Sequence, residues 1–486
     1  MLRDKISSVI ERAIANNLWR QNRCFNLIPS ETTPSLLVKL CEISDPAGRY
    51  AEHRTLKGKE IYFYQGTDFI RDVEEETRAA FYEYFGCTRA ELRPISGQMA
   101  NEVVFKAMLK FLNRAPAPGT PAGPFRRMRA VMNNELTKGG HLSSQPMGAL
   151  FNFVETDPAT GKEKVVNFPV MKDDPYRIDV SKLEGLLLSE RPELVVFGKS
   201  MFIQPEPVRE VAESAGRMNP RPLIMYDMAH VLGLYGAFQE PLHEGADVLT
   251  GSTHKTFFGP QRGVIASSIP KDSPHAPFWA EVKSRAFPGS TSNHHLGTLL
   301  GLLVAVYEMN TFKKEYQTQV IKNARAFARH LKAQGLDVEG NPTLGYTSTH
   351  QVILRVRKHG TGEDVARGLE ENGIVVNYQA LPDDESFINS SGLRTGVQEM
   401  TRFGMKEGDF EPLAALMADV IVRKKDVRDE VARRRAAFME MQYCVPAAEA
   451  VPLAARVLAS MLHESDYAKL FARNLETAAG LLERAR

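Results

Sequence analysis

Short apolar runs alternate with helical patterns through the middle of the chain. The runs at 194–197 and 223–226 are rich in β-branched and other apolar residues, which is typical of strands buried in a parallel sheet. Between them, residues 207–215 carry apolar positions at helical spacing, and residues 180–188 do the same ahead of the first run. This alternation of strands and helices predicts an α/β fold.

A second pattern of strands and helices follows a long helical stretch. Residues 296–331 are expected to form that helix, and 351–356 and 374–377 are expected to form strands with a helix between them. We therefore predict three parts, which are an N-terminal helical arm at 1–45, a large domain at 46–310, and a small C-terminal domain with a helical extension at 311–486.

The arm should contain an amphipathic helix over residues 2–22, because its apolar positions recur at helical spacing. Such a helix needs another surface to pack on.

The proline-rich stretch at 114–127 is expected to be a surface loop, and we assign no function to it or to the C-terminal extension.

Composition excludes several classes of partner. With 43% hydrophobic and 25% charged residues, and with 61 basic against 59 acidic residues, the chain matches a globular protein with no global preference for nucleic acid or anionic membranes. The four cysteines form no paired motif, which argues against a disulfide framework and against a zinc site, so no metal is predicted. We expect a cytoplasmic protein without a signal peptide or membrane segment.

The chemistry is expected where two predicted strands end. Asp227 closes the run that begins at Leu223, and Lys255 follows the run that begins at Val248. Open α/β sheets place their functional groups at the carboxyl ends of strands. A buried lysine is a candidate for Schiff-base chemistry, and a nearby carboxylate suits the ring nitrogen of a pyridine cofactor. Taken singly, Asp227 would more often be a helix cap and Lys255 a solvated loop residue.

The residues around these two positions resemble a known family. Asp227-Met-Ala-His230, followed by Thr253-His-Lys-Thr256 and Gly259-Pro260, is similar to the serine hydroxymethyltransferases, which are fold-type I pyridoxal phosphate enzymes. The resemblance extends from about residue 27 to about residue 441. It implies a large domain with a mainly parallel seven-stranded sheet between helices, a smaller α/β C-terminal domain, and pyridoxal 5'-phosphate as cofactor. It also implies homodimers whose active sites are shared between subunits.

Two glycine-containing motifs fit cofactor binding. Ser96-Gly97-Gln98 opens a predicted helix, where backbone N–H groups and a hydroxyl favour a phosphate, although a plain helix cap is as good a reading of Ser96. Gly139-Gly-His141 matches a family motif whose histidine stacks on the cofactor ring, although a lone histidine is more often structural. The cofactor-binding residues that the resemblance implies are Ser96, Gly97, Gln98, His141, Ser200, Asp227, His230, Ser252, His254, Lys255, Ser292 and Asn293.

The resemblance also implies substrate and catalytic roles. Arg394 lies in Ser391-Gly-Leu-Arg-Thr-Gly396, where the family places the arginine that binds the substrate carboxylate through its planar, always charged fork. Glu52 matches the family glutamate that moves the proton of the substrate hydroxyl. The implied catalytic residues are Lys255, Glu52, Tyr64 and His230, and the implied substrate-binding residues are Ser30, Tyr50, Glu52, Tyr64 and Arg394. Ser30 could also cap the helix predicted near residues 35–43.

Several positions depart from the family pattern, and Lys199, beside Ser200, is one of them. His53 replaces a glycine, Phe63 replaces the first of two tyrosines, and residues 290–295 replace a glycine pair that binds the phosphate of the neighbouring subunit's cofactor. In the segment that binds folate in the family, Gln379 replaces an asparagine. These changes leave the use of tetrahydrofolate open.

Aldol-type chemistry at the Cα–Cβ bond of a β-hydroxy-α-amino acid is the predicted function. The carbon acceptor is either tetrahydrofolate, in a hydroxymethyltransferase, or an aldehyde, in a folate-independent threonine aldolase or transaldolase. A decarboxylase or oxidase of a glycine-like unit is a further alternative. A non-enzymatic cofactor-binding protein is the remaining one, and the presence of Lys255 argues against it.

Overall fold

The computed structural model describes residues 2–57, 59–115, 123–385, 388–462, 466–467 and 469–475. Part of the proline-rich segment, 116–122, therefore lies outside the described residues, as does the end of the C-terminal extension. The chain divides into two compact units, a large unit of Thr32–Gln317 and a small unit of Met1–Glu31 with Thr318–Arg486. Among the described residues, no helix has the length and apolar character needed to cross a membrane.

The large unit is built on one seven-stranded sheet in the order β4-β10-β9-β8-β7-β5-β6. The five strands from β6 to β9 run parallel, whereas β10 is antiparallel to both of its neighbours. The predicted mainly parallel seven-stranded sheet is thus confirmed. The strands are β4 (Arg89–Glu91), β5 (Val131–Asn133), β6 (Val165–Asn167), β7 (Leu194–Gly198), β8 (Leu223–Asp227), β9 (Val248–Ser252) and β10 (Gly263–Ser267).

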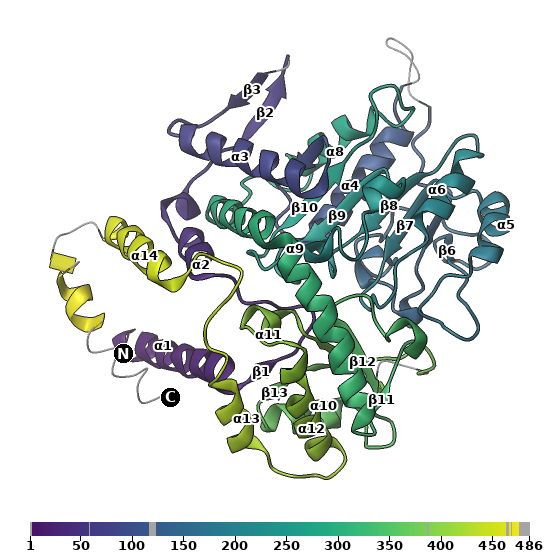
Figure 1. The fold of residues 1–486 in the computed structure, drawn as a ribbon. Helices are drawn as coiled ribbons and strands as arrows, with labels where there is room; N and C mark the ends of the chain where they lie inside the picture. Colours follow the sequence, from purple (N-terminus) through teal and green to yellow (C-terminus); the bar gives the residue numbers. More distant parts are fainter. Residues whose placement is uncertain are drawn as a thin grey trace. The chain divides into compact units, whose positions relative to one another are not determined.

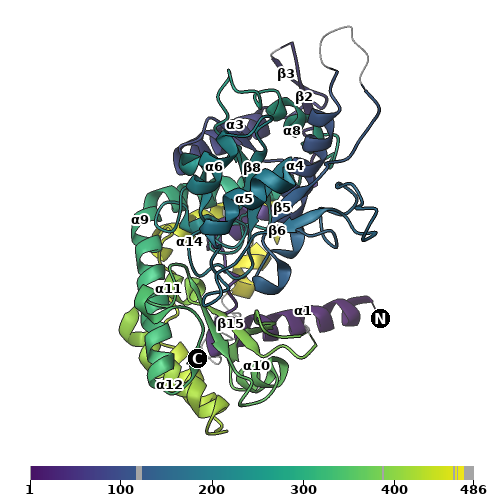
Figure 2. The same ribbon diagram turned by 90° about the vertical axis from the view of Figure 1, so that its right-hand side faces the viewer.

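Helices cover both faces of this sheet (Figures 1 and 2). Because side chains alternate along a strand, Leu194 and Val196 of β7 join one core with helices α4 (Gly97–Leu112) and α8 (Phe278–Ala286). Phe197 points to the other face and packs against Tyr226 of β8. The helices α5 (Val180–Glu190) and α6 (Val208–Gly216) follow β6 and β7 in the chain, as the sequence predicts. The central strands β7 and β8 are apolar along nearly their whole length because both faces of the sheet are buried there.

A hairpin projects from the large unit (Figures 1 and 2). Its strands β2 (His53–Leu56) and β3 (Lys59–Tyr62) pair antiparallel and lead into helix α3 (Asp68–Phe85). Helix α2 (Leu36–Glu42) precedes the hairpin, and the long helix α9 (Leu296–Ala333) begins in the large unit and ends in the small one.

The small unit contains a four-stranded antiparallel sheet in the order β11-β12-β15-β14. The run predicted as one strand at 374–377 is divided, because β13 pairs with β1 near the N-terminus whereas β14 pairs with β15. The elements are β1 (Phe25–Asn26), β11 (Asp337–Val338), β12 (Gln351–Arg355), β13 (Ile374–Val375), β14 (Asn377–Gln379) and β15 (Gly392–Gly396), with helices α10 (Gly362–Glu371) and α12 (Phe410–Ile421).

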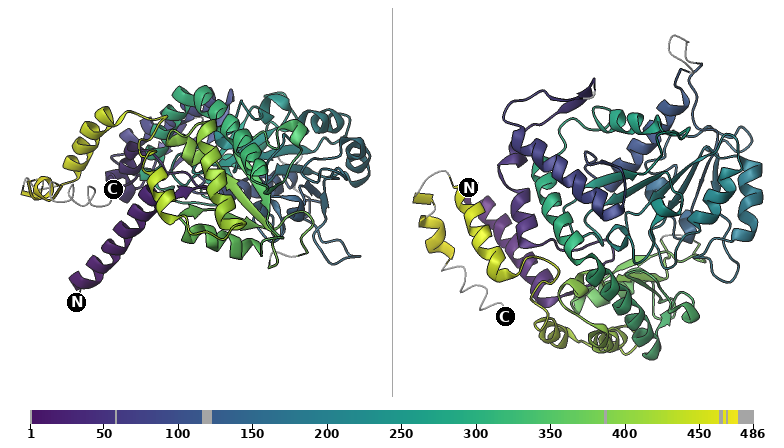
Figure 3. Two further views of the ribbon diagram at one scale, coloured as in Figure 1. Left: turned by 60° about the horizontal axis from the view of Figure 1, so that its bottom comes forward. Right: turned by 45° about the horizontal axis from the view of Figure 1, so that its top comes forward.

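Helix α1 (Leu2–Leu18) extends away from the sheet of the small unit as a single arm (Figure 3). None of the α1 residues that the structure describes is buried, and its apolar positions stay accessible, with Leu2 75% exposed and Ile10 52% exposed. The amphipathic helix predicted here therefore forms, but its apolar face has no cover within the described part of this chain. Helix α14 (Ala447–Met461) belongs to the C-terminal extension.

Candidate active site

Asp227 is a charged residue of the large unit with several close partners, and it lies at the carboxyl end of β8. It is buried, its Oδ2 lies 2.5 Å from Nδ1 of His141, and Nδ2 of Asn101 donates to the same oxygen over 2.8 Å. The backbone N–H of Ala229 donates to Oδ1 over 2.9 Å. Burial alone would raise the pKa of Asp227, but the charge and hydrogen bonds of these neighbours hold the pKa below its ordinary value. The site therefore keeps a buried, ionised carboxylate.

Lys255 lies in the turn after β9 and is half-buried. Its Nζ is 3.3 Å from Nε2 of His230, which lies three residues beyond Asp227. The rings of His230 and His141 meet edge to face with centroids 5.1 Å apart. Four residues predicted from the sequence, Asp227, His230, Lys255 and His141, thus gather where β8 and β9 end.

The N-terminus of α4 lies against the same edge of the sheet. Ser96 caps the helix by accepting a hydrogen bond from the N–H of Met99 over 3.1 Å, and a methyl group added to Gly97 would come within 2.9 Å of Cβ of Ser252. Only glycine admits this approach of β9 to the helix terminus. The hydroxyl of Ser252 donates to the carbonyl of Ala229 over 3.0 Å.

His254 and Gln98 are two further residues predicted to bind the cofactor. Burial, reinforced by the positive charge of Lys255, lowers the pKa of His254 to about 4, so its ring is neutral at physiological pH. Gln98 is exposed at the first turn of α4. A helix of 16 residues offers unpaired N–H groups and a positive dipole end to an anion here.

Ser200 lies next to the glycine pair that precedes His141. Its N–H donates to the carbonyl of Gly139 over 2.8 Å. Lys199, which departs from the family pattern, points elsewhere, because its buried ammonium lies 2.5 Å from Oε1 of Glu206 and donates to the carbonyl of Tyr176. The lysine is therefore a structural ion-pair partner, and it leaves Ser200 beside the His141 segment.

A second group of predicted residues lies in the segments that flank the projecting hairpin and in the segment before α9. The rings of Tyr50 and Tyr64 are 5.2 Å apart, and the two residues are 50% and 43% exposed. Glu52 is half-buried, and Ser292 is exposed. Nδ2 of Asn293 donates to the carbonyl of Arg49 over 2.6 Å, which ties this segment to the chain leading to Tyr50.

The small unit holds the third group. Arg394 is buried on β15, where burial lowers its pKa to about 10, and its Nε donates to Oδ1 of Asn377 over 3.3 Å. Ser30 follows Leu27, whose carbonyl accepts from the N–H of Gly396 over 2.7 Å, so the Ser30 turn lies beside the strand that carries Arg394. Ser35, and not Ser30, caps helix α2 by accepting from the N–H of Val38.

Asn101 is a site residue that sequence reasoning missed. Besides contacting Asp227, it accepts a hydrogen bond from Thr250 over 2.6 Å and donates to Ser143 over 2.8 Å. It thereby connects α4, β9 and the segment after His141. The signal was present in the sequence, because Asn101 ends the segment Ser96-Gly-Gln-Met-Ala-Asn101, but a buried amide shows its role only when its partners are known.

The fold and this group of side chains define the class of the protein, a fold-type I pyridoxal phosphate enzyme. The family model described as serine hydroxymethyltransferase matches residues 4–417, and the chain belongs to that family. The predictions of family, fold class and enzyme class, a hydroxymethyltransferase-like transferase acting at the Cα–Cβ bond, are confirmed. The family implies pyridoxal phosphate as cofactor.

Individual relatives cover nearly the whole chain. The serine hydroxymethyltransferase of Staphylothermus marinus is 38% identical over 446 residues, which are 90% of this chain and 93% of that protein. The serine hydroxymethyltransferase of Archaeoglobus fulgidus is 38% identical over 431 residues, covering 87% and 90%. Among solved structures, the L-threonine transaldolase of Pseudomonas fluorescens matches with a TM-score of 0.75 and 26% identity over 92% of this chain and 95% of that one.

Proposed function

We propose that this chain binds pyridoxal 5'-phosphate at the carboxyl ends of β8 and β9 and transfers the hydroxymethyl group of serine, leaving glycine. The observation that carries the proposal is the buried, ionised Asp227 in one cluster with His141, His230 and Lys255. When bound, the cofactor supplies an electron-withdrawing ring that takes up the charge left at Cα when the Cα–Cβ bond breaks.

The residues present fit this group. Asp227 offers a negative charge for a protonated pyridine nitrogen, and the hydrogen bonds from Asn101 and Ala229 hold that charge in place. The phosphate would be held at the N-terminus of α4 by Ser96, Gly97, Gln98, Ser252 and His254. Ser200 would contact the substituents of the cofactor ring. Lys255 would carry the cofactor covalently, and His141 would lie on the ring.

Three residues of the chain would act on the amino acid. Arg394 would hold the substrate carboxylate, because a buried guanidinium whose pKa is lowered by desolvation gains from an anionic partner. Ser30, beside the same strand, would contact the same carboxylate. Glu52 would hold and return the proton of the substrate hydroxyl.

We further propose that two copies of this chain share their active sites, with Tyr50, Glu52, Tyr64, Ser292 and Asn293 serving the site of the partner subunit. The exposure of both tyrosines, which flank the projecting hairpin, supports this assignment. The uncovered apolar face of α1 supports a homodimer too, because an amphipathic helix of 17 residues is stable when its apolar side is packed. The four free cysteines suit the reducing cytoplasm predicted from the sequence.

Tetrahydrofolate is the proposed acceptor, as the family implies. The test is glycine release from L-serine by the cofactor-loaded protein, measured with and without tetrahydrofolate. Release that requires tetrahydrofolate supports the proposal. Equal release in its absence contradicts the folate step while leaving the cofactor chemistry in place, and absence of any release with both serine and threonine contradicts the proposed activity itself.

An aldehyde acceptor is the second candidate, and specific observations favour it. The structural neighbour from Pseudomonas fluorescens is an L-threonine transaldolase. In this chain Phe63 lacks the hydroxyl of the family tyrosine, and Gln379 replaces the second asparagine of the folate segment, while the first, Asn377, hydrogen-bonds Arg394. If folate makes no difference, L-threonine with a panel of aldehydes is the substrate set that should yield new β-hydroxy-α-amino acids.

A further inference from the structure

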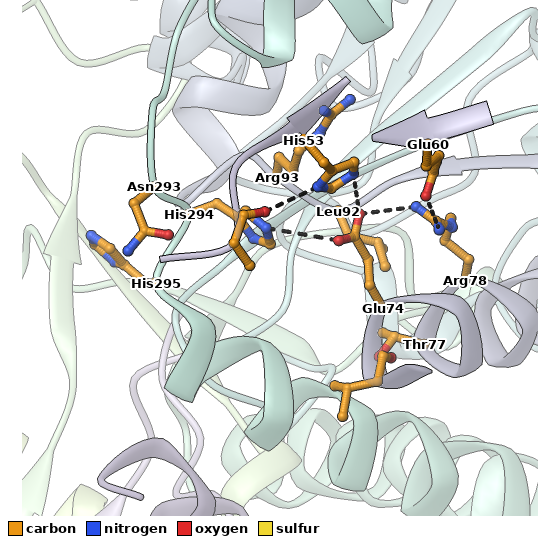
Figure 4. Close-up of polar contacts among 12 residues, drawn as sticks. His53, Glu60, Glu74, Thr77, Arg78, Leu92, Arg93, Asn293, His294 and His295 are labelled. Carbon is orange, nitrogen blue, oxygen red and sulfur yellow. Dashed lines mark hydrogen bonds and ion pairs between the residues drawn. The ribbon is translucent and has the colours of Figure 1, made fainter. Parts of the chain in front are cut away.

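Glu74 is a buried carboxylate that the proposed chemistry does not use. It lies on the inner face of α3, below the hairpin, and is 1% exposed. Its Oε1 pairs with the guanidinium of Arg78 over 2.9 Å, one helical turn further on, and Arg78 also reaches Glu60 of β3 over 3.3 Å. Figure 4 shows two histidines from different segments pointing toward this carboxylate.

His53 approaches Glu74 from the hairpin. The Nε2 of its buried ring is 3.5 Å from Oε1 of Glu74, and its Nδ1 is 3.1 Å from the carbonyl oxygen of Ala51. Because a carbonyl only accepts hydrogen bonds, Nδ1 carries the proton in that contact. The ring also stacks on Tyr62 with centroids 4.4 Å apart. His53 thus connects the residue before Glu52 with α3, at a position where the family has a glycine.

His294 approaches Glu74 from the segment before α9. Its Nδ1 accepts from the guanidinium of Arg262 over 3.1 Å, so the ring proton lies on Nε2, which is 3.9 Å from Oε2 of Glu74. Burial, reinforced by the cations of Arg262 and Arg93, lowers the pKa of His294 and keeps this ring neutral. Arg262 also donates to the carbonyl of His295 over 2.9 Å.

These contacts join the two segments that this chain is proposed to supply to its partner's active site. His53, at the start of β2, and His294, in the segment before α9, each place a ring nitrogen beside the Glu74 carboxylate, at 3.5 Å and 3.9 Å, so the two segments meet at this side chain. The hydrogen bond from Asn293 to the carbonyl of Arg49 and that from the N–H of Phe63 to the carbonyl of Glu52 lie between the same segments. Glu91 pairs with Arg93 over 2.6 Å, so that cation is neutralised without Glu74.

We propose that Glu74 is a positioning residue that holds Glu52 and the Ser292–Asn293 segment in a fixed relation through His53 and His294. The inference rests on the proposed function, because it needs Glu52 to act on substrate and Asn293 to contact cofactor. Groups that act together on one substrate must be held within a fraction of an ångström, and buried polar contacts between separate segments provide such restraint.

The experiment compares Glu74→Gln with Glu83→Gln, which changes an exposed residue of the same helix. For each cofactor-loaded protein, kcat and KM for glycine release and the dissociation constant of pyridoxal phosphate are measured below the unfolding midpoint. Glu74→Gln should lower kcat and raise the cofactor dissociation constant, each by roughly tenfold. Glu83→Gln should stay within about twofold of wild type in both quantities.

Single variants of His53 and His294 test the two contacts of Glu74 separately. His53→Asn should lower kcat and leave the cofactor dissociation constant near that of wild type, whereas His294→Asn should raise the dissociation constant and spare kcat at saturating cofactor. Glu74→Gln added to His53→Asn should lower kcat no further, because His53→Asn has already removed the contact between Glu74 and the hairpin.

Two outcomes overturn the proposal. One is a Glu74→Gln protein with a lower unfolding midpoint but wild-type kcat and cofactor affinity, which would make Glu74 purely structural. The other, decisive if Glu74→Gln does not fold, is wild-type behaviour of both histidine variants. If the wild-type chain releases no glycine, the proposed function fails. The cofactor dissociation constants would still test the contact between His294 and Glu74.

Discussion

The Nδ1 atom of His141 lies 2.5 Å from the Oδ2 atom of Asp227, which connects the segment after a glycine pair with the carboxyl end of β8. The contact offsets the cost of burying the carboxylate and fixes the orientation of the imidazole ring at the same time. One short contact therefore fixes both a negative charge and a flat ring, which are the two features that the proposed cofactor site needs.

Lys255 is expected to be the covalent attachment point of the cofactor. Borohydride reduction of the cofactor-loaded wild type should add the mass of one reduced cofactor to the peptide that contains Lys255. The Lys255→Ala protein should gain no such mass and lose its visible absorption. Modification of another lysine in wild type, or an unchanged spectrum in the variant, would refute the assignment.

Arg394→Ala is expected to weaken amino-acid binding by about 2–5 kcal/mol, because a buried charged hydrogen-bond pair with the substrate carboxylate is lost. Glycine affinity, measured by calorimetry on the cofactor-loaded protein, gives the value. Arg394→Lys keeps the charge but loses the planar fork, so its affinity should fall between those of wild type and Arg394→Ala. Equal glycine affinity in all three proteins would remove Arg394 from the site.

Asn101→Ala is expected to destabilise the folded chain by about 1–3 kcal/mol, because Thr250, Ser143 and Asp227 each lose a buried partner. Urea unfolding at neutral pH measures this loss. The neighbouring Glu102, which pairs with Lys106 at the surface of the same helix, offers a matched control, and Glu102→Gln should change the free energy of unfolding by less than about 0.5 kcal/mol. Similar stabilities of the two variants would contradict the role of Asn101.

The low pKa of His254 predicts a loss of stability in acid. In the unfolded chain this histidine binds a proton near pH 6.5, whereas in the folded chain it does so only near pH 4. Between these values the unfolded state binds more protons, so the free energy of unfolding falls as the pH decreases from about 6.5 to about 4. The fall should be shallower in cofactor-free His254→Asn.

The control for this pH series is His295→Asn. His295 is exposed and has a positive φ of 56°, a backbone conformation that asparagine tolerates. Its variant should follow the wild-type pH dependence between pH 4 and 7. If His254→Asn follows that same curve, burial does not shift the titration of His254 as the structure indicates.

Much of the large unit could be predicted because its central strands are apolar on both faces and end in recognisable polar residues. Asp227 and Lys255 were predicted to lie close together in this way, since neighbouring parallel strands bring their carboxyl ends to one edge. Asn101 and Glu74 were not found, because each acts through side chains distant in sequence. The His53 substitution was visible in the sequence, but its partner on α3, 21 residues away, depends on how the hairpin folds over the helix.

The strand predicted at 374–377 shows another limit of sequence patterns. Its apolar residues correctly indicate extended backbone, but the pattern does not show that Ile374 pairs with the N-terminal Phe25 while Asn377 pairs with Arg394. Pairing partners are set by tertiary structure, and alternation along one strand carries no information about them.

The projecting hairpin has a genetic consequence if the sites are shared as proposed. A chain with Lys255→Ala would still offer an intact hairpin to its partner, and a chain with Glu52→Gln would still offer an intact lysine. Coexpressed, the two inactive alleles should complement each other, because each mixed dimer contains one site built wholly from unaltered residues. A single mutant allele beside a normal one should leave the output of each normal chain unchanged, because a mixed dimer also keeps one site built wholly from unaltered residues.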